Sequence, residues 1–246
     1  MLLAALASGL ALAFAVVVAA RFVRSGRPAF AAWALGLLIF SAAAAFQAAG
    51  EGGGFGQVTF RGFYLLGGVL GVVYLALGTL FLLAPRRVAW TAAGLLAVIT
   101  VILAIDAAVI PVDQTQLATP AGVLGGTAQH PTFPQGSPLY IGVVFLNIIG
   151  TVVLVGGSAW SAYRYFRDHA GIDRVVCNVL LTAGALVIAY GFASAKTLGV
   201  GSLDVLGAYE AAGIALMFLG FLSLGRVGHR AATPAPASAT AGSPKR

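Results

Sequence analysis

Four ionisable side chains lie near one end of the long apolar stretches of this sequence. They are Arg61, Asp106, Lys196 and Glu210. Glu210 belongs to the apolar stretch AYEAAGIALMFLGFLSLG, residues 208–225. A charge at the centre of a lipid bilayer costs about 2.5–3.5 kcal/mol on insertion scales, and less near the surface. We therefore expect Glu210 to face other helices and to have a cationic partner, either Arg61 or Lys196.

Uncharged polar side chains at a similar depth complete a candidate site. They are Gln47, Tyr64, Asn147 and Tyr209. A carboxylate and a cation beside such hydrogen-bonding groups form a polar cavity that can bind a small solute or relay a proton. The alternative is a salt bridge that ties two helices together near the lipid headgroups and binds no ligand. The residues leave both interpretations open.

The sequence has none of the motifs that signal common catalytic or metal sites. It contains no GxSxG, HExxH or GxxxxGK[ST] pattern. Its histidines, His130, His169 and His229, lie outside the apolar segments, and its single cysteine cannot form an intrachain disulfide. We therefore predict no catalytic residue, metal or cofactor. An intramembrane enzyme that pairs Asp106 with Glu210 is kept as a third hypothesis.

The composition places these residues in a membrane protein. Of the 246 residues, 60% are hydrophobic and only 9% are charged, and the mean hydropathy is +0.97. A soluble domain carries roughly 25% charged residues. A run of about 20 apolar residues spans a bilayer as a helix, because a helix satisfies its own backbone hydrogen bonds.

Seven apolar segments of this length predict an all-α protein with seven transmembrane helices. The segments are 2–20, 29–49, 62–84, 88–110, 139–163, 173–194 and 205–224. Residues 1–225 are thus predicted to form one transmembrane domain. We expect the first segment to be retained rather than cleaved as a signal peptide, because its positive charges follow the apolar run.

The charge of the connecting segments predicts the orientation. RFVRSGR, PRR, YRYFRDHAGIDR and the tail from Arg226 carry 12 of the 14 Lys and Arg residues. Basic connections usually face the cytoplasm. We therefore expect an external N-terminus and a cytoplasmic C-terminus in a bacterial-type plasma membrane. The net charge of +7 has the same explanation, so we expect lipid and no nucleic acid as a partner.

Two segments outside the helices have distinctive compositions. Residues 111–138 form the longest connection, and their prolines and glycines predict an irregular external loop. Residues 226–246 are rich in Ala, Pro, Ser and Thr, which predicts a disordered cytoplasmic tail.

The first and last three helices align as a possible parallel repeat. RFVRSGRPAFAAW aligns with YFRDHAGIDRVVC, and YLLGGVLGVVYLALG with YEAAGIALMFLGFLS, at offsets of about 144–145. A three-one-three layout with an external N-terminus resembles that of the SWEET sugar transporters, and the general arrangement of rhodopsin-like receptors. The chain lacks the Pro-Gln signature within its crossings and a lysine in its seventh helix, so the resemblance assigns no functional residue.

Glycines on two of the predicted helices favour close packing. Gly67 and Gly71 lie four residues apart on the third helix, and Gly213 and Gly220 share a face of the seventh. Small residues let membrane helices approach closely, within one chain or between the copies of a homo- or hetero-oligomer.

The residues support three functional hypotheses. The first is a proton-coupled protein that binds or transports a small solute or ion at an outward-facing polar site. The alternative is a non-catalytic sensor or assembly subunit that binds other membrane proteins. The intramembrane enzyme is the third.

Overall fold

A computed structural model describes residues 1–127, 129–169, 171–197 and 203–224, and the predicted tail 226–246 lies outside these residues. The described part is all-helical apart from an isolated β-bridge between Gly126 and Pro131. Seven of its helical spans are long and apolar enough to cross a membrane. The long helices are α1 (Leu2–Ser25), α2 (Pro28–Gly53), α3 (Gln57–Leu65), α4 (Gly71–Leu83), α5 (Arg86–Val109), α7 (Pro138–Arg167), α8 (Ile172–Thr197) and α9 (Leu203–Ser223).

The third span is one continuous helical rod with a change of pitch. Between α3 and α4 the chain forms one π-helical turn, η1 (Leu66–Leu70), so that α3, η1 and α4 together cover Gln57–Leu83. Such π-turns leave backbone carbonyls without regular helical partners and are frequent at functional sites.

The seven predicted spans are confirmed, and several helices are longer than predicted. Helix α1 continues through Arg21 and Arg24 to Ser25, where Gly26 takes a left-handed φ of 63° and donates its N–H to Phe22. Helix α2 runs to Gly53 and so includes Glu51. A helix can continue through polar residues beyond its apolar run, because arginine and glutamate are compatible with helical backbone hydrogen bonding.

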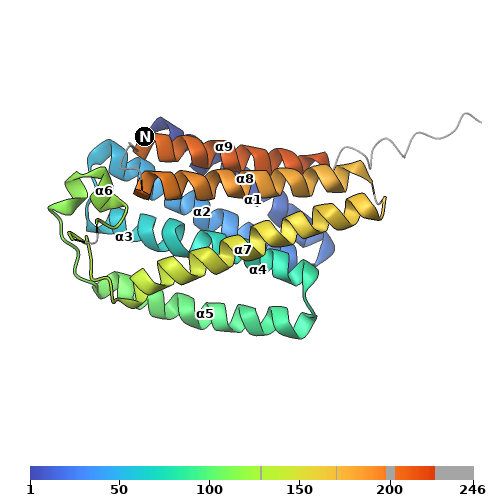
Figure 1. The fold of residues 1–246 in the computed structure, drawn as a ribbon, viewed down its shortest axis with the longest axis horizontal. Coiled ribbons are helices and arrows are strands. Elements are labelled where there is room, and N and C mark those ends of the chain that lie inside the picture. The colour runs from blue at the N-terminus through green and yellow to red at the C-terminus, as the bar shows by residue number, and fades with distance from the viewer. Residues whose placement is uncertain (128, 170, 198–202, 225–246) are drawn as a thin grey trace, which may run out of the picture.

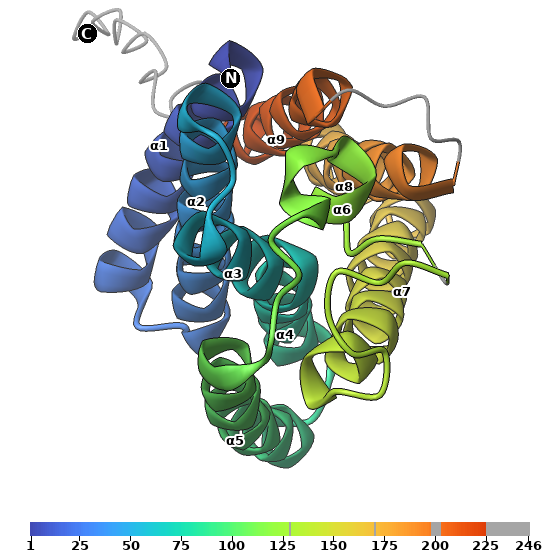
Figure 2. The same cartoon turned by 90° about the vertical axis from the view of Figure 1, so that its left-hand side faces the viewer.

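Six of the spans form a ring, and the fourth stands outside it. Neighbouring contacts follow the order α1, α2, α4, α7, α8, α9 and back to α1. Figure 2 shows this ring seen along the bundle, with α5 apart from it. The main contacts of α5 with other long helices are to the α3–α4 span and to α7. The ring therefore encloses an interior that six helices line.

The two ends of the bundle differ in character (Figure 1). We call the end that carries Met1 and segment 111–138 the Met1 end. The opposite end, which we call the arginine end, carries the α1–α2, α4–α5 and α7–α8 connections.

Segment 111–138 folds over the Met1 end and is less irregular than predicted. It contains a 3-10 turn, η2 (Gln116–Ala118), and a short helix, α6 (Pro120–Val123). Thr119 initiates α6, since its side chain accepts the N–H of Gly122 and Pro120 supplies the first helical φ. Four apolar side chains of the segment are buried against the bundle: Leu117, Val123, Leu124 and Phe133.

The predicted close packing at Gly213 and Gly220 is present between α8 and α9. A Cβ atom on Gly213 would lie 2.4 Å from Cγ1 of Ile188 and 2.6 Å from the backbone oxygen of Gly184. A Cβ atom on Gly220 would lie 2.8 Å from Cβ of Leu180. Side chains larger than hydrogen would therefore force these two helices apart.

We predict that Gly213→Ala destabilises the protein by about 1–3 kcal/mol, the usual cost of overpacking a tight interior. Gly156→Ala on α7 is the matched control, because no atom lies within 4 Å of its added Cβ. The control should be neutral or slightly stabilising, since alanine favours helix more than glycine does. Thermal unfolding in detergent measures both, and equal stability of the two variants would contradict the packing of α8 on α9.

Candidate functional site

The predicted site residues do lie towards the Met1 end, but the structure divides them between two sides of the bundle. Arg61 and Asp106 lie where α3 and α7 meet α5, whereas Gln47 and Glu210 lie on α2 and α9. The two groups have different surroundings and different hydrogen-bond partners. Each group is therefore described separately below.

Arg61 binds the end of α5 and does not pair with Glu210, so the first of its two predicted partners is excluded, and the second, Lys196, stays a prediction. Its Nη1 donates to the carbonyl of Ala108 at 2.6 Å, and its Nη2 to that of Ile110 at 2.8 Å. The last carbonyls of a helix lack partners within the helix and carry its negative partial charge. The Arg61 guanidinium therefore caps α5, and this role explains its position.

Asp106 performs the corresponding role at the start of α7. Its Oδ2 accepts the backbone N–H of Leu139 at 2.8 Å, and the Ser137 hydroxyl accepts that of Tyr140 at 3.2 Å. These are the first N–H groups of α7, which have no partner within the helix. A carboxylate at a helix N-terminus is also favoured by the helix dipole. Asp106 thus connects α5 to α7.

Glu210 is the buried carboxylate whose position the sequence left open. It lies on α9, and 3% of its surface is exposed. Its Oε2 has no hydrogen-bond partner among the described residues. The Glu51 carboxylate of α2 is near enough to interact with it electrostatically. Lys196 belongs to α8, but its side chain lies outside the described part of the chain.

Gln47 and Glu51 form the rest of this carboxyl cluster, which we define as Gln47, Glu51 and Glu210. Gln47 is fully buried; its Nε2 donates to Glu51 at 2.8 Å and to the carbonyl of Leu203 at 3.3 Å. Its Oε1 has no partner. Acceptors therefore outnumber donors in the cluster, although a buried acceptor without a partner costs about 1–3 kcal/mol.

Glu51 was missed by the sequence reading, which ended the second helix at residue 49. The signal was its spacing, because Glu51 lies four residues after Gln47. Two residues four apart lie on one face of a helix. That face is buried only if the helix continues through residue 51, as α2 does.

The carboxyl cluster adjoins a pocket at the surface of the Met1 end. The Met1 α-amino group contacts Glu51 and lies 2.9 Å from Oδ1 of Asp204. The hydrogen bond to Glu51, and to a smaller extent the one to Asp204, raises the pKa of this amino group above its ordinary value. A pocket of about 650 Å³ is lined by Met1, Glu51 and Asp204, together with Gln114 and Thr119 of segment 111–138, which we call the covering segment.

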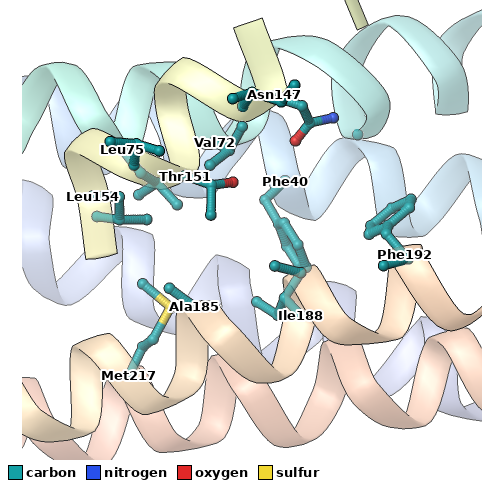
Figure 3. A pocket seen from close by; sticks show the side chains of 15 residues that line it. Phe40, Val72, Leu75, Asn147, Thr151, Leu154, Ala185, Ile188, Phe192 and Met217 are labelled. Atoms are coloured by element: carbon teal, nitrogen blue, oxygen red, sulfur yellow. The ribbon is translucent and has the colours of Figure 1, made fainter. Parts of the chain in front are cut away.

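A separate, mainly apolar cavity of about 420 Å³ is lined by residues of α2, α4, α7, α8 and α9. Figure 3 shows Asn147 and Thr151 of α7 facing Phe40, Ile188 and Met217 across it. The Asn147 Nδ2 donates to the carbonyl of Gly68 in the π-turn η1. Asn147 thus joins α7 to η1, and together with Thr151 it supplies polar groups to a mainly apolar wall.

A second cavity extends the first towards the Met1 end. Its volume is about 350 Å³, and it shares Asn147 and Phe192 with the first cavity. Tyr64 lines it and is buried. Tyr209 instead packs its ring against Tyr190 of α8, with centroids 5.6 Å apart. The structure therefore brings Tyr64 and Asn147 to one cavity, and this cavity is not lined by Tyr209.

Between these cavities and the arginine end the ring is filled by apolar side chains, a region that we call the constriction. It encloses only about 20 Å³. It shares Leu75, Leu154 and Met217 with the 420 Å³ cavity. On its other side it shares lining residues with a cavity of about 880 Å³, which we call the arginine-end cavity. The shared residues there are Trp33, Leu181 and Phe221.

None of the protein-family models, curated proteins or solved structures compared with this chain matches it. The fold and the site therefore carry the functional argument. Seven long apolar helices define the class as a multi-pass membrane protein. The described residues hold no group of three or more His, Cys, Asp or Glu side chains that would bind a metal ion.

We predict that Asp106→Ala lowers the stability of the protein by about 1 kcal/mol, the usual cost of losing a helix N-terminal cap. Asp106→Asn retains an acceptor oxygen for the Leu139 N–H and should lose less. Thermal unfolding of the purified variants compares them. If Asp106→Ala unfolds at the wild-type temperature, Asp106 does not cap α7 in the way described here.

Proposed function

We propose that this chain is a plasma-membrane transport protein that moves a small solute through the ring of six helices, with protons exchanged at the carboxyl cluster. The arginine end faces the cytoplasm, because basic segments are retained on that side. The N-terminus is then external, and the pocket lined by Glu51 and Asp204 opens outwards. The proposal makes the protein a carrier rather than an enzyme.

The single observation that carries this proposal is the series of cavities along the interior. Two cavities on the Met1 side and one on the arginine side are separated by a constriction of about 20 Å³. Side chains alone close this constriction, among them Leu154 and Met217. A transporter needs a solute chamber and a barrier, and the cavities and the constriction are our candidates for the two.

The order of helices in the ring supports the proposed repeat. Exchanging α1, α2 and α4 for α7, α8 and α9 converts each neighbouring pair into another neighbouring pair. For example, α1–α2 becomes α7–α8, and α2–α4 becomes α8–α9. Parallel repeats related in this way have an axis along the membrane normal and often bind solute at their interface. Helix α5 is then the linker between the halves.

The carboxyl cluster supports proton coupling. Two ionised carboxylates repel each other strongly in a water-poor interior. Protonation of Glu210 adds a donor to a group of residues that has too few donors. Proton exchange with the external pocket would then change the charge between α2 and α9, which are both helices of the ring.

We predict that Met217→Ala opens the constriction and increases solute leak. Reconstituted vesicles should shrink and recover faster in osmotic light scattering with glycerol, urea and acetate as probes. Leu219→Ala is the matched control on α9, because Leu219 is 57% exposed on the outside of the bundle. Thermal unfolding of both variants checks that the bundle remains folded.

Equal leak rates for Met217→Ala and Leu219→Ala in folded protein would contradict a path through the ring. They would favour the alternative, a non-catalytic sensor or assembly subunit whose helix faces bind other membrane proteins. Leu154→Ala tests the same barrier from α7 and should give the same increase as Met217→Ala.

We predict that Glu210→Gln abolishes accumulation driven by a proton gradient while it leaves downhill exchange intact. The glutamine has the same shape but cannot release a proton. The measurement is uptake of a panel of labelled small solutes into vesicles with an imposed pH gradient. Asp113→Asn is the control, since Asp113 is an exposed carboxylate of the covering segment. Wild-type accumulation by Glu210→Gln, with lowered thermal stability, would assign Glu210 a structural role.

A further inference from the structure

The arginine-end cavity has a composition that differs from that of the other interior cavities. It measures about 880 Å³, and side chains from all six helices of the ring line it. Three arginines reach it: Arg21 from α1, Arg27 from the α1–α2 connection and Arg174 from α8. None of the described residues that line it is acidic. Its deep wall is apolar and aromatic, and continues to the constriction at Trp33 and Phe221.

Aromatic rings hold two of these guanidinium groups in place. The Arg21 guanidinium lies over the rings of Phe221 and Phe30, 5.0 and 5.8 Å from their centroids. The Arg174 guanidinium lies 5.5 Å from the ring of Tyr165. Stacking on a ring fixes the plane of a guanidinium and leaves its N–H groups free at the edge. Both cations are therefore oriented in advance for an anion.

Neither Arg21, Arg27 nor Arg174 forms an ion pair with a carboxylate of the described residues. The nearest arginine that does so is Arg167, which pairs with Asp168 outside the cavity. Hydrogen-bonding side chains accompany the cations, since Ser25 lies one turn after Arg21 and Asn178 one turn after Arg174. The cavity thus concentrates positive charge that none of the described carboxylates neutralises.

We propose that the arginine-end cavity binds the phosphate group of an amphiphile. The phosphate lies between Arg21 and Arg174, and the apolar part of the ligand lies against the aromatic wall near Trp33. Guanidinium groups bind phosphate oxygens in pairs of parallel hydrogen bonds. Basic pockets between membrane helices on the cytoplasmic side are suited to anionic headgroups. This site does not depend on the transport proposed above.

Retention of positive charge in the cytoplasm does not by itself explain this arrangement. Arginines that act only through charge extend towards the lipid headgroups from the outside of a bundle. Five other described arginines of this end are exposed and do not line the cavity: Arg24, Arg86, Arg87, Arg164 and Arg167. Arg21, Arg27 and Arg174 instead line the cavity beside its apolar wall, with Arg21 half-buried and Arg27 and Arg174 exposed.

The test uses Trp33 as a reporter, because it lines the cavity. The chain has three tryptophans, and Trp90 and Trp160 are exposed. In a variant with both replaced by Phe, Trp33 is the sole tryptophan. Its fluorescence is measured in nanodiscs that contain phosphatidylglycerol or phosphatidylcholine with brominated acyl chains. We expect at least twofold stronger quenching by the brominated phosphatidylglycerol.

Arginine variants in the same background identify the site. Arg21→Gln with Arg174→Gln should abolish the difference between the two lipids, whereas Arg24→Gln, on the exposed side of α1, should retain it. Equal quenching by both lipids, or equal loss with Arg24→Gln, overturns the proposal. Thermal unfolding of each variant in phosphatidylcholine nanodiscs confirms that it is folded.

A competition experiment distinguishes the two sources of phosphate. Glycerol 3-phosphate is added to nanodiscs that contain brominated phosphatidylglycerol. Recovery of Trp33 fluorescence shows that the arginines also accept a soluble phosphate monoester. Quenching that persists shows that the site selects the membrane lipid. Because Glu210→Gln leaves this cavity intact, the phosphate site and the transport proposal can fail separately.

Discussion

Buried polar groups in this bundle must find partners within the protein, because lipid offers none. Arg61 and Asp106 supply such partners to the helix termini at the two ends of segment 111–138. Arg61 donates to carbonyls at the end of α5, and Asp106 accepts from the start of α7. Without these contacts the segment would begin and end at unsatisfied helix termini. The carboxyl cluster does not meet the requirement, which is why it is the candidate for exchange of protons.

The interior follows from the same requirement together with packing. Small residues bring α8 and α9 into close contact at Gly184 and Gly213. On another side of the ring, α7 is connected to its neighbour, the α3–α4 span, where Asn147 donates to the π-turn carbonyl of Gly68. Between these closely packed walls the ring retains cavities on either side of an apolar constriction. The Asn147 contact therefore connects two helices of the cavity wall, and the Arg61 and Asp106 contacts stabilise the Met1 end of the bundle.

Much of the fold was predictable, and less of the candidate site. The seven spans were predicted because each depends on a local run of apolar residues. The burial of Glu210 and the interhelical position of Asn147 were also accessible, since polar side chains avoid lipid. The partner of Arg61 could not be predicted from the sequence. A guanidinium at this depth has two kinds of acceptor, a carboxylate and the carbonyls of a helix C-terminus. The choice depends on how α3 is rotated against α5.

The sequence by itself determined that the chain forms apolar helices, where they begin and end to within a few residues, and which ends are basic. Those properties depend on composition over short distances and on the thickness of the lipid core. Only the tertiary structure decided that Glu51 joins Gln47 and Glu210, and that Arg21 and Arg174 face a common cavity. Those groupings combine residues from different helices, and they depend on the rotation and tilt of each helix against its neighbours.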